Sequence, residues 1–173
     1  IVPTSSTINQ LSIGDALAIS TLNQKKISKK DFKKFHPSGN LGTKLRTVEE
    51  IMIIGNKIPF VNGNLIMKKA LQIISNKKLG ILVVRNSKGI TIGVITDGQI
   101  RRFNEVNDNL QSLTVKEVMT LNPISIDKDT LVEKALSIMN SKKITSLCVH
   151  SKKNLKRTVG ILHIHKILET NIN

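Results

Sequence analysis

An internal repeat is the feature that most constrains this chain of 173 residues. Residues 48–52 read Val-Glu-Glu-Ile-Met, and residues 115–119 read Val-Lys-Glu-Val-Met. In both copies a short proline-containing stretch follows, and then a helical pattern over residues 65–74 and 131–139. Apolar residues at i, i+3, i+4 and i+7 predict an amphipathic helix in each. The chain is therefore expected to contain two tandem copies of one fold.

The rest of each copy predicts two strands and a closing helix. Short apolar runs separated by a polar hairpin are typical of paired strands. In the first copy these are residues 80–84, 90–96 and 98–103, and in the second copy residues 146–149, 158–163 and 165–170. Each copy thus reads β-α-β-β-α with a shared core, which is a mixed α/β fold. The polar residues 104–113 are expected to link the copies.

Composition excludes several classes of protein. Hydrophobic residues make up 39% of the chain, enough for a core, and 23% of the residues are charged. No apolar run approaches the roughly 18 residues of a membrane span, so no membrane partner is expected. The single Cys148 cannot form an internal disulfide and suits a reducing, cytoplasmic location. The chain begins at Ile1 and not at Met, which predicts a fragment.

The formal charge of +15 raises the question of nucleic-acid binding. Only five of the 27 basic residues are Arg, the side chain that forks onto phosphate or guanine, and aromatic residues make up 2%. The lysines occur in scattered pairs. This pattern favours a solvated basic surface without a specific nucleic-acid partner. A basic nucleic-acid-binding protein is kept as an alternative hypothesis.

Residues 48 to about 170 resemble a tandem pair of cystathionine-β-synthase (CBS) domains. The order of elements, the Val-x-x-hydrophobic-Met segment and the strand end Gly93-Val94-Ile95-Thr96-Asp97 carry the resemblance. It implies two pseudo-symmetric domains, at residues 46–104 and 105–173, with two clefts for adenosyl or other nucleotide ligands. The two methionines, Met52 and Met119, are expected to be packing residues and not cofactor ligands.

The first 45 residues contain three further motifs. Pro-Thr-Ser-Ser-Thr at residues 3–7 offers hydroxyl caps for a long apolar helix that contains Gly14-Asp15-Ala16-Leu17-Ala18. A second short helix over residues 28–35 precedes the loop His-Pro-Ser-Gly-Asn-Leu-Gly at residues 36–42. These helices have no sheet to cover them and cannot fold alone. In this order the three motifs resemble the C-terminal end of a sugar isomerase (SIS) domain. The alternative is a helical extension of the CBS pair.

A SIS domain followed by two CBS domains is the arrangement of arabinose-5-phosphate isomerases. The resemblance implies an isomerase of D-ribulose 5-phosphate and D-arabinose 5-phosphate, in the supply of Kdo for lipopolysaccharide, with no cofactor. It implies a homo-oligomer, a dimer through the CBS pair and a tetramer for the full enzyme. The free-standing alternative is a CBS binding module without enzymatic activity.

His36 is the one candidate catalytic residue. Its unperturbed pKa near 6.5 suits acid/base transfer of a proton between two sugar carbons, and it matches the family's histidine in this loop. A structural loop histidine is the alternative. The family's other active-site groups, a lysine, two glutamates and a phosphate loop, have no counterpart here. The chain alone is therefore predicted to be inactive on its sugar phosphate substrate.

The candidate ligand-binding residues follow the CBS motif. They are Thr96, Asp97, Gln99, Arg101, Thr145, Ser146, His163 and Lys166. Nucleotide-binding CBS domains carry an acid that accepts from both ribose hydroxyls, but Gln99 and Lys166 stand at those positions and His163 replaces the second threonine. The clefts are expected to suit an anionic ligand instead, such as a nucleotide or a CMP-sugar effector, with empty clefts and a purely oligomeric role as the alternative.

A metal site is not expected. His163 and His165 lie two residues apart, but a zinc site takes three or four ligands and only Cys148 and His150 lie within reach on another strand.

Overall fold

The computed structural model describes residues 3–27, 31, 45–105 and 109–171. Contacts divide the chain into two compact units, Ile1–Leu45 and Arg46–Asn173, and each is described by itself. Among the described residues, no helix is both long and apolar enough to cross a membrane.

The first unit contains helix α1, Thr4–Gln24. No residue of α1 is buried, and its large apolar side chains are mostly about 60% exposed, for example Leu11 at 66% and Leu17 at 64%. The expected hydroxyl cap is wrong, because Pro3 precedes the helix and the Ser6 and Thr7 hydroxyls donate back to the Pro3 carbonyl. The expected helix at residues 28–35, Asp31 excepted, and the loop at 36–42 lie outside the described residues.

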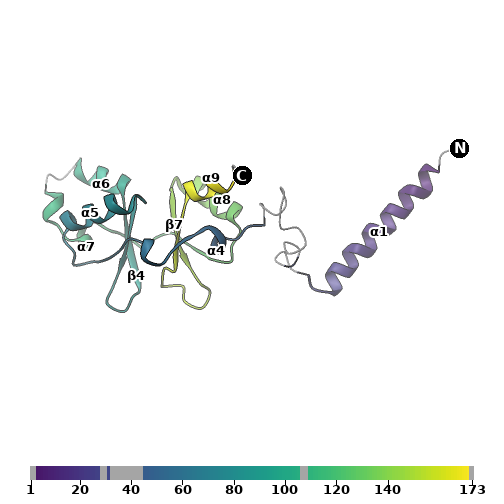
Figure 1. Ribbon diagram of the computed structural model, residues 1–173, viewed down its shortest axis with the longest axis horizontal. Helices are drawn as coiled ribbons and strands as arrows, with labels where there is room; N and C mark the ends of the chain where they lie inside the picture. Colours follow the sequence, from purple (N-terminus) through teal and green to yellow (C-terminus); the bar gives the residue numbers. More distant parts are fainter. Residues whose placement is uncertain (1–2, 28–30, 32–44, 106–108, 172–173) are drawn as a thin grey trace. The chain divides into compact units, whose positions relative to one another are not determined.

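The second unit contains both copies of the repeat (Figure 1). The elements of the first copy are α4 Val48–Ile51, β1 Ile53–Ile54, η1 Gly55–Lys57, β2 Phe60–Asn62, α5 Met67–Lys77, β3 Ile81–Arg85, β4 Thr91–Thr96 and α6 Asp97–Asn104. Those of the second copy are η2 Leu110–Ser112, α7 Val115–Val118, β5 Thr120–Leu121, β6 Ser125–Asp127, α8 Val132–Lys142, β7 Ser146–His150, β8 Gly160–His163 and α9 Ile164–Asn171. The predicted helices and the longer strands are confirmed.

The short helix that opens each copy is capped in the same way. The backbone N–H and hydroxyl of Thr47 donate to the Glu50 carboxylate at 3.0 Å, and Thr114 donates to Glu117 at 2.7 and 2.6 Å. These capping boxes satisfy the backbone donors at the start of the helix. Because both hydrogen bonds favour the charged form, the pKa of Glu117 is lowered.

The two sheets exchange their shortest strands between the copies. One sheet has the order β2-β3-β4-β5 and the other β1-β8-β7-β6. β5, from the second copy, pairs antiparallel with β4, and β1, from the first copy, pairs antiparallel with β8. Each half of the unit is therefore completed by the opening segment of the other copy, whereas the sequence pattern predicted self-contained copies.

The cores follow the same exchange. Val115 and Val118 of α7 pack with α5, β3 and β4, and Val48 of α4 packs with α8, β7 and β8. A third cluster joins the facing sides of the two sheets through Ile58, Ile81, Val83, Cys148 and Ile161. Figure 1 shows the helices on the outer sides of the two sheets.

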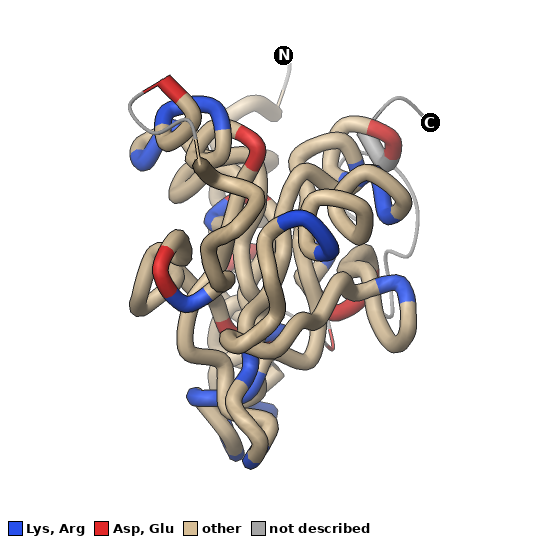
Figure 2. Tube along the Cα trace, turned by 90° about the vertical axis from the view of Figure 1, so that its left-hand side faces the viewer, with Lys and Arg blue, Asp and Glu red and all other residues tan. Residues whose placement is uncertain are grey.

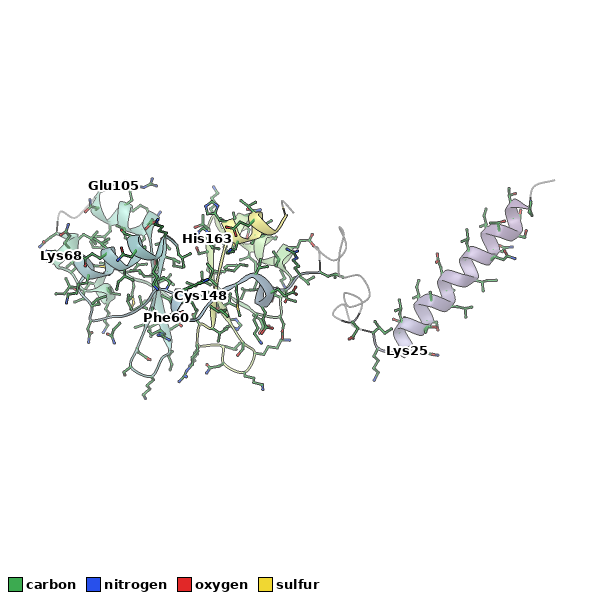
Figure 3. All side chains as sticks on the ribbon, viewed as in Figure 1. Lys25, Phe60, Lys68, Glu105, Cys148 and His163 are labelled. Carbon is green, nitrogen blue, oxygen red and sulfur yellow. The ribbon has the colours of Figure 1, made fainter. Side chains whose placement is uncertain are left out.

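Cys148 lies in the middle of this sheet-to-sheet contact (Figure 3) and is 2% exposed. Its burial raises the pKa of the thiol to about 11, against a smaller lowering by the Thr158 hydroxyl. The thiol is therefore protonated and inert at neutral pH.

The stretch expected to be a polar linker, residues 104–113, also reaches the first core. Leu110 of η2 is 4% exposed and packs with Ala70 and Ile74 of α5. The linker therefore holds the second copy against the first.

The two methionines of the repeat explain two glycines. A Cβ atom on Gly93 of β4 would lie 2.7 Å from the Met119 sulfur and 2.8 Å from the Thr120 carbonyl oxygen. A Cβ on Gly160 of β8 would meet the Met52 sulfur in the same way. Glycine is thus required where the exchanged strand and its methionine cross each sheet, which confirms the expectation that the methionines pack.

We expect Gly93→Ala to destabilise the protein by about 1–3 kcal/mol, because the methyl group overpacks the contact with Met119 and the Thr120 carbonyl. Gly98→Ala is the matched control, since a Cβ there meets only the Arg102 side chain, at 3.6 Å, on a helix. Urea unfolding measures both. Equal stability of the two variants would contradict the close crossing.

Candidate functional site

A cavity of about 660 Å³ opens between the two halves of the second unit. Both copies of the repeat line it, at the end of the sheets where β3 and β7 begin and β4 and β8 end. Its polar lining residues are Lys78, Thr96, Asp97, Gln99, Arg102, Thr120, Asn122, Lys143, Thr145, Ser146, His163 and His165. Ile81, Val94 and Cys148 contribute apolar wall.

Two lysines reach the cavity from equivalent places. Lys78 ends α5 and Lys143 ends α8, each in the left-handed backbone conformation, with φ of 53° and 52°. This conformation stops each helix and turns the chain into the following strand. Both lysines are exposed and line the cavity.

The start of α6 positions three of the predicted residues. The Thr96 hydroxyl caps the helix by accepting from the Gln99 backbone N–H at 3.3 Å. Asp97 lies over Gly80, where an added Cβ would be 2.9 Å from its Oδ2 atom, and Gly80 has a positive φ of 60°. The Asp97 backbone N–H donates to the Gly80 carbonyl at 3.1 Å.

The side chain of Gln99 is already engaged. Its Nε2 atom donates to the Val118 carbonyl at the end of α7. The amide therefore ties α6 of the first copy to α7 of the second copy. In the CBS resemblance this position holds the acid that recognises ribose, so the site lacks that acceptor here.

His163 and His165 stack beside the cavity, with ring centroids 5.0 Å apart and an interplanar angle of 25°. The His165 backbone N–H donates to His163 Nδ1 at 3.2 Å, which assigns the proton of the neutral His163 ring to Nε2. Burial, and secondly the neighbouring His165, lower the pKa of His163. An anion bound beside His163 would oppose this lowering, because a neighbouring negative charge favours the protonated ring.

Six of the eight predicted cleft residues line the cavity, and two do not. Arg101 is exposed and lies outside the cavity, whereas Arg102 lines it. Successive side chains of an α-helix point in directions about 100° apart, so only one of these two neighbours faces the cavity. Lys166 is exposed and pairs with Glu169 at 2.6 Å. The lysines 78 and 143 were missed, since a helix-ending lysine looks like ordinary solvated charge. The candidate catalytic His36 lies outside the described residues.

The charges around the cavity favour an anion. Lys78, Arg102 and Lys143 line it, and Asp97 is the one carboxylate among the described lining residues. Three cations against one acid give a positive field in a partly enclosed site, which attracts negative ligands. In the described part of the chain, no group of three or more His, Cys, Asp or Glu residues is placed to hold a metal.

Comparisons with known proteins agree with this fold. A profile of the CBS domain matches residues 48–105 and 115–172. The chain is 41% identical over 170 residues to "Arabinose 5-phosphate isomerase KdsD" of Francisella tularensis, covering 98% of this chain and 51% of that protein. It is 35% identical over 165 residues to "Arabinose 5-phosphate isomerase KpsF" of Escherichia coli, covering 95% of this chain and 49% of the relative. The chain thus spans about half the length of these curated relatives.

Solved structures share the fold of the second unit. An uncharacterised conserved protein from Pyrococcus horikoshii aligns with a TM-score of 0.66 at 23% identity, covering 75% of this chain and 95% of that one. CBSX2 in complex with AMP aligns with a TM-score of 0.64 at 20% identity, covering 73% and 96%. At these identities the likeness concerns the fold alone.

The lowered pKa of His163 predicts a pH dependence of stability. In the window between the lowered pKa and about 6.5, the unfolded chain binds more protons than the folded chain. The free energy of unfolding should therefore rise as the pH rises through this window and fall as the pH drops through it.

Titration of His163 by NMR should give a midpoint below 6.5, and His165→Gln should raise that midpoint because it removes the second cause of the shift. A His163 midpoint at or above 6.5 in the unmodified chain would contradict the described burial.

Proposed function

The chain belongs to the CBS domain family, and we propose that it is the C-terminal regulatory part of an arabinose-5-phosphate isomerase. In this proposal the CBS pair binds an anionic nucleotide or nucleotide-sugar effector. The observation that carries the effector proposal is the cavity between the copies, lined by Lys78, Arg102 and Lys143 against a single carboxylate. The identities of 35% and 41% to arabinose 5-phosphate isomerases over nearly the whole chain support the enzyme assignment.

The cations of the cavity favour the anionic part of such a ligand. Arg102 can fork onto a phosphate or carboxylate, and the two lysines act as point charges at equivalent places in the two copies. With Gln99 bonded to α7, the vicinal hydroxyls of a ribose lack their usual carboxylate. This lining therefore supports selection of a ligand by its negative charge more than by its ribose. A CMP-linked sugar acid carries negative charge on its phosphate and its carboxylate.

Helix α8 links the cavity to the first residue of the second unit. Lys143 follows the C-terminal end of α8, and at the other end of that helix the Val132 backbone N–H donates to the Arg46 carbonyl at 2.9 Å. Arg46 is the first residue of the second unit. In this proposal a ligand that moves α8 also shifts the backbone of Arg46.

We expect Arg102→Gln to weaken binding of an anionic nucleotide roughly 10- to 100-fold, because a charge-assisted contact is worth about 1.5–3 kcal/mol. Arg101→Gln is the matched control, with the same change one residue away and outside the cavity. Calorimetric titration with AMP, CMP and CMP-Kdo measures the affinity. Equal weakening in both variants would assign the effect to net charge, and no heat with any ligand would leave the CBS pair an assembly role.

His36 is proposed as the acid/base residue of the isomerase reaction, in a site completed by a catalytic domain. Without that domain the chain should not convert ribulose 5-phosphate. In a protein that joins both parts, His36→Ala should lower turnover by about 10²- to 10⁴-fold, the usual contribution of general acid–base catalysis. An assay of arabinose 5-phosphate formation measures it, and unchanged turnover would remove the catalytic role.

The second candidate is a free-standing CBS module, for which α1 with its exposed apolar side chains would be a dimerisation arm. The intact mass of the protein in its source cells separates the two. A mass above 19.1 kDa by one further domain supports the isomerase, and a mass of 19.1 kDa supports the module. A cytoplasmic homo-oligomer, with dimers formed through the CBS pair, is part of the isomerase proposal.

A further inference from the structure

A second polar depression lies at the opposite end of the sheets from the main cavity. It has a volume of about 370 Å³ and is lined by residues from β2, the end of β3 and the hairpin that follows. Figure 3 labels Phe60 toward this end and His163 toward the other. The lining residues used below are Phe60, Asn62, Arg85, Asn86 and Gly89.

The side chains that face this depression are held in place as donors. The Arg85 guanidinium lies over the Phe60 ring, 3.3 Å from its centroid. Asn62 Oδ1 accepts from the Asn64 N–H at 2.9 Å, and Asn86 Oδ1 accepts from the Lys88 and Ile90 N–H groups at 3.0 and 2.9 Å. Because only oxygen can accept these bonds, each amide has its NH₂ group left to donate.

More positive charge is brought in by the neighbouring hairpin. Arg157, between β7 and β8, donates to the Lys88 carbonyl at 2.8 Å, and a Cβ on Gly89 would lie 3.8 Å from its guanidinium carbon. The Thr91 and Thr158 hydroxyls, 2.8 Å apart, join the two hairpins. Burial, and secondly the charge of Arg157, lower the pKa of Arg85.

The described lining of the depression carries no carboxylate. The residues that line the depression, and the hairpin residues 151–158 beside it, include no Asp or Glu. Figure 2 shows Lys and Arg gathered at the lower end of the molecule, where the hairpins of Figure 1 lie.

The second copy of the repeat serves as an internal comparison. Asn62 pairs with Arg85 in the strand register, and the equivalent pair of the second copy is Asp127 with His150. There the Asp127 carboxylate lies 3.9 Å from His150 Nδ1, so the negative charge comes from the protein itself. In the first copy an uncharged amide stands at that place, and the arginine faces an open depression.

We propose that the depression bounded by Asn62, Arg85 and Asn86 binds a phosphate monoester, through the guanidinium and the two amide NH₂ groups. The phosphate can come from a free phosphorylated metabolite or from a lipid headgroup, since both present the same oxyanion. This site is separate from the effector cavity, and it exists in only one copy of the repeat.

The test is Asn62→Asp, which gives the first copy the acid that the second copy already has. The Asx bond to Asn64 is kept, because aspartate also accepts there. Asn64→Asp is the matched control, since it adds the same charge two residues away at an exposed position outside the depression. Dispersed NMR spectra of both variants check the fold.

Inorganic phosphate should shift the amide signals of residues 85–89 in a saturable way. Asn62→Asp should weaken this binding at least about tenfold and Asn64→Asp no more than about twofold, because an adjacent carboxylate competes for the guanidinium. No saturable shift at residues 85–89, or equal weakening by the two variants, would overturn the proposal. Shifts confined to residues 96–99 would report the effector cavity alone and would equally overturn it.

Vesicles distinguish the two sources. Two kinds of phosphatidylcholine vesicle are compared, one with added phosphatidic acid and one with added phosphatidylserine. Co-sedimentation with the phosphatidic acid vesicles alone, and its loss in Asn62→Asp, would identify a lipid headgroup. Phosphate binding without co-sedimentation would identify a soluble phosphorylated metabolite.

Discussion

The exchange of opening segments between the two copies is the constraint on which the second unit depends. Each opening helix and its two-residue strand leave their own copy and complete the sheet and core of the other. The crossing is tight, because Met119 lies against Gly93 and Met52 against Gly160, where no side chain fits. Neither copy can therefore bury its core alone, and the pair has to fold as one body.

The cavity between the copies is a product of the same exchange. Thr120 of the exchanged strand β5 and Asn122, which follows that strand, line the cavity. Thr96 and Asp97 line it from the other copy. The Gln99 side chain bonds to the Val118 carbonyl just before that strand. Polar groups from the two copies thus meet in one cavity because the segments cross. The pseudo-symmetry is broken by residue type, as at Thr96 and His163, and this makes the two sides of the cavity chemically different.

Much of this arrangement could be predicted from the sequence, because the repeat marks the same elements twice. The apolar faces of α5 and α8 follow from helical periodicity, and the buried strands β3 and β7 follow from short apolar runs beside a polar hairpin. The exchange could not be predicted from periodicity, since two-residue strands show none and both copies carry the same pattern whichever sheet they join. Arg101 and Arg102 were equivalent in the sequence, and only the start of α6 at Asp97 decides which reaches the cavity. Lys78 and Lys143 depend on the left-handed ends of their helices.

Calorimetric unfolding of the chain tests the exchange most directly. If each copy completes the other, residues 46–171 unfold in one cooperative transition, with a calorimetric enthalpy equal to the van't Hoff enthalpy. Two separate transitions, one for each copy of the repeat, would contradict the account. They would show that each copy holds its own core without the opening segment of the other.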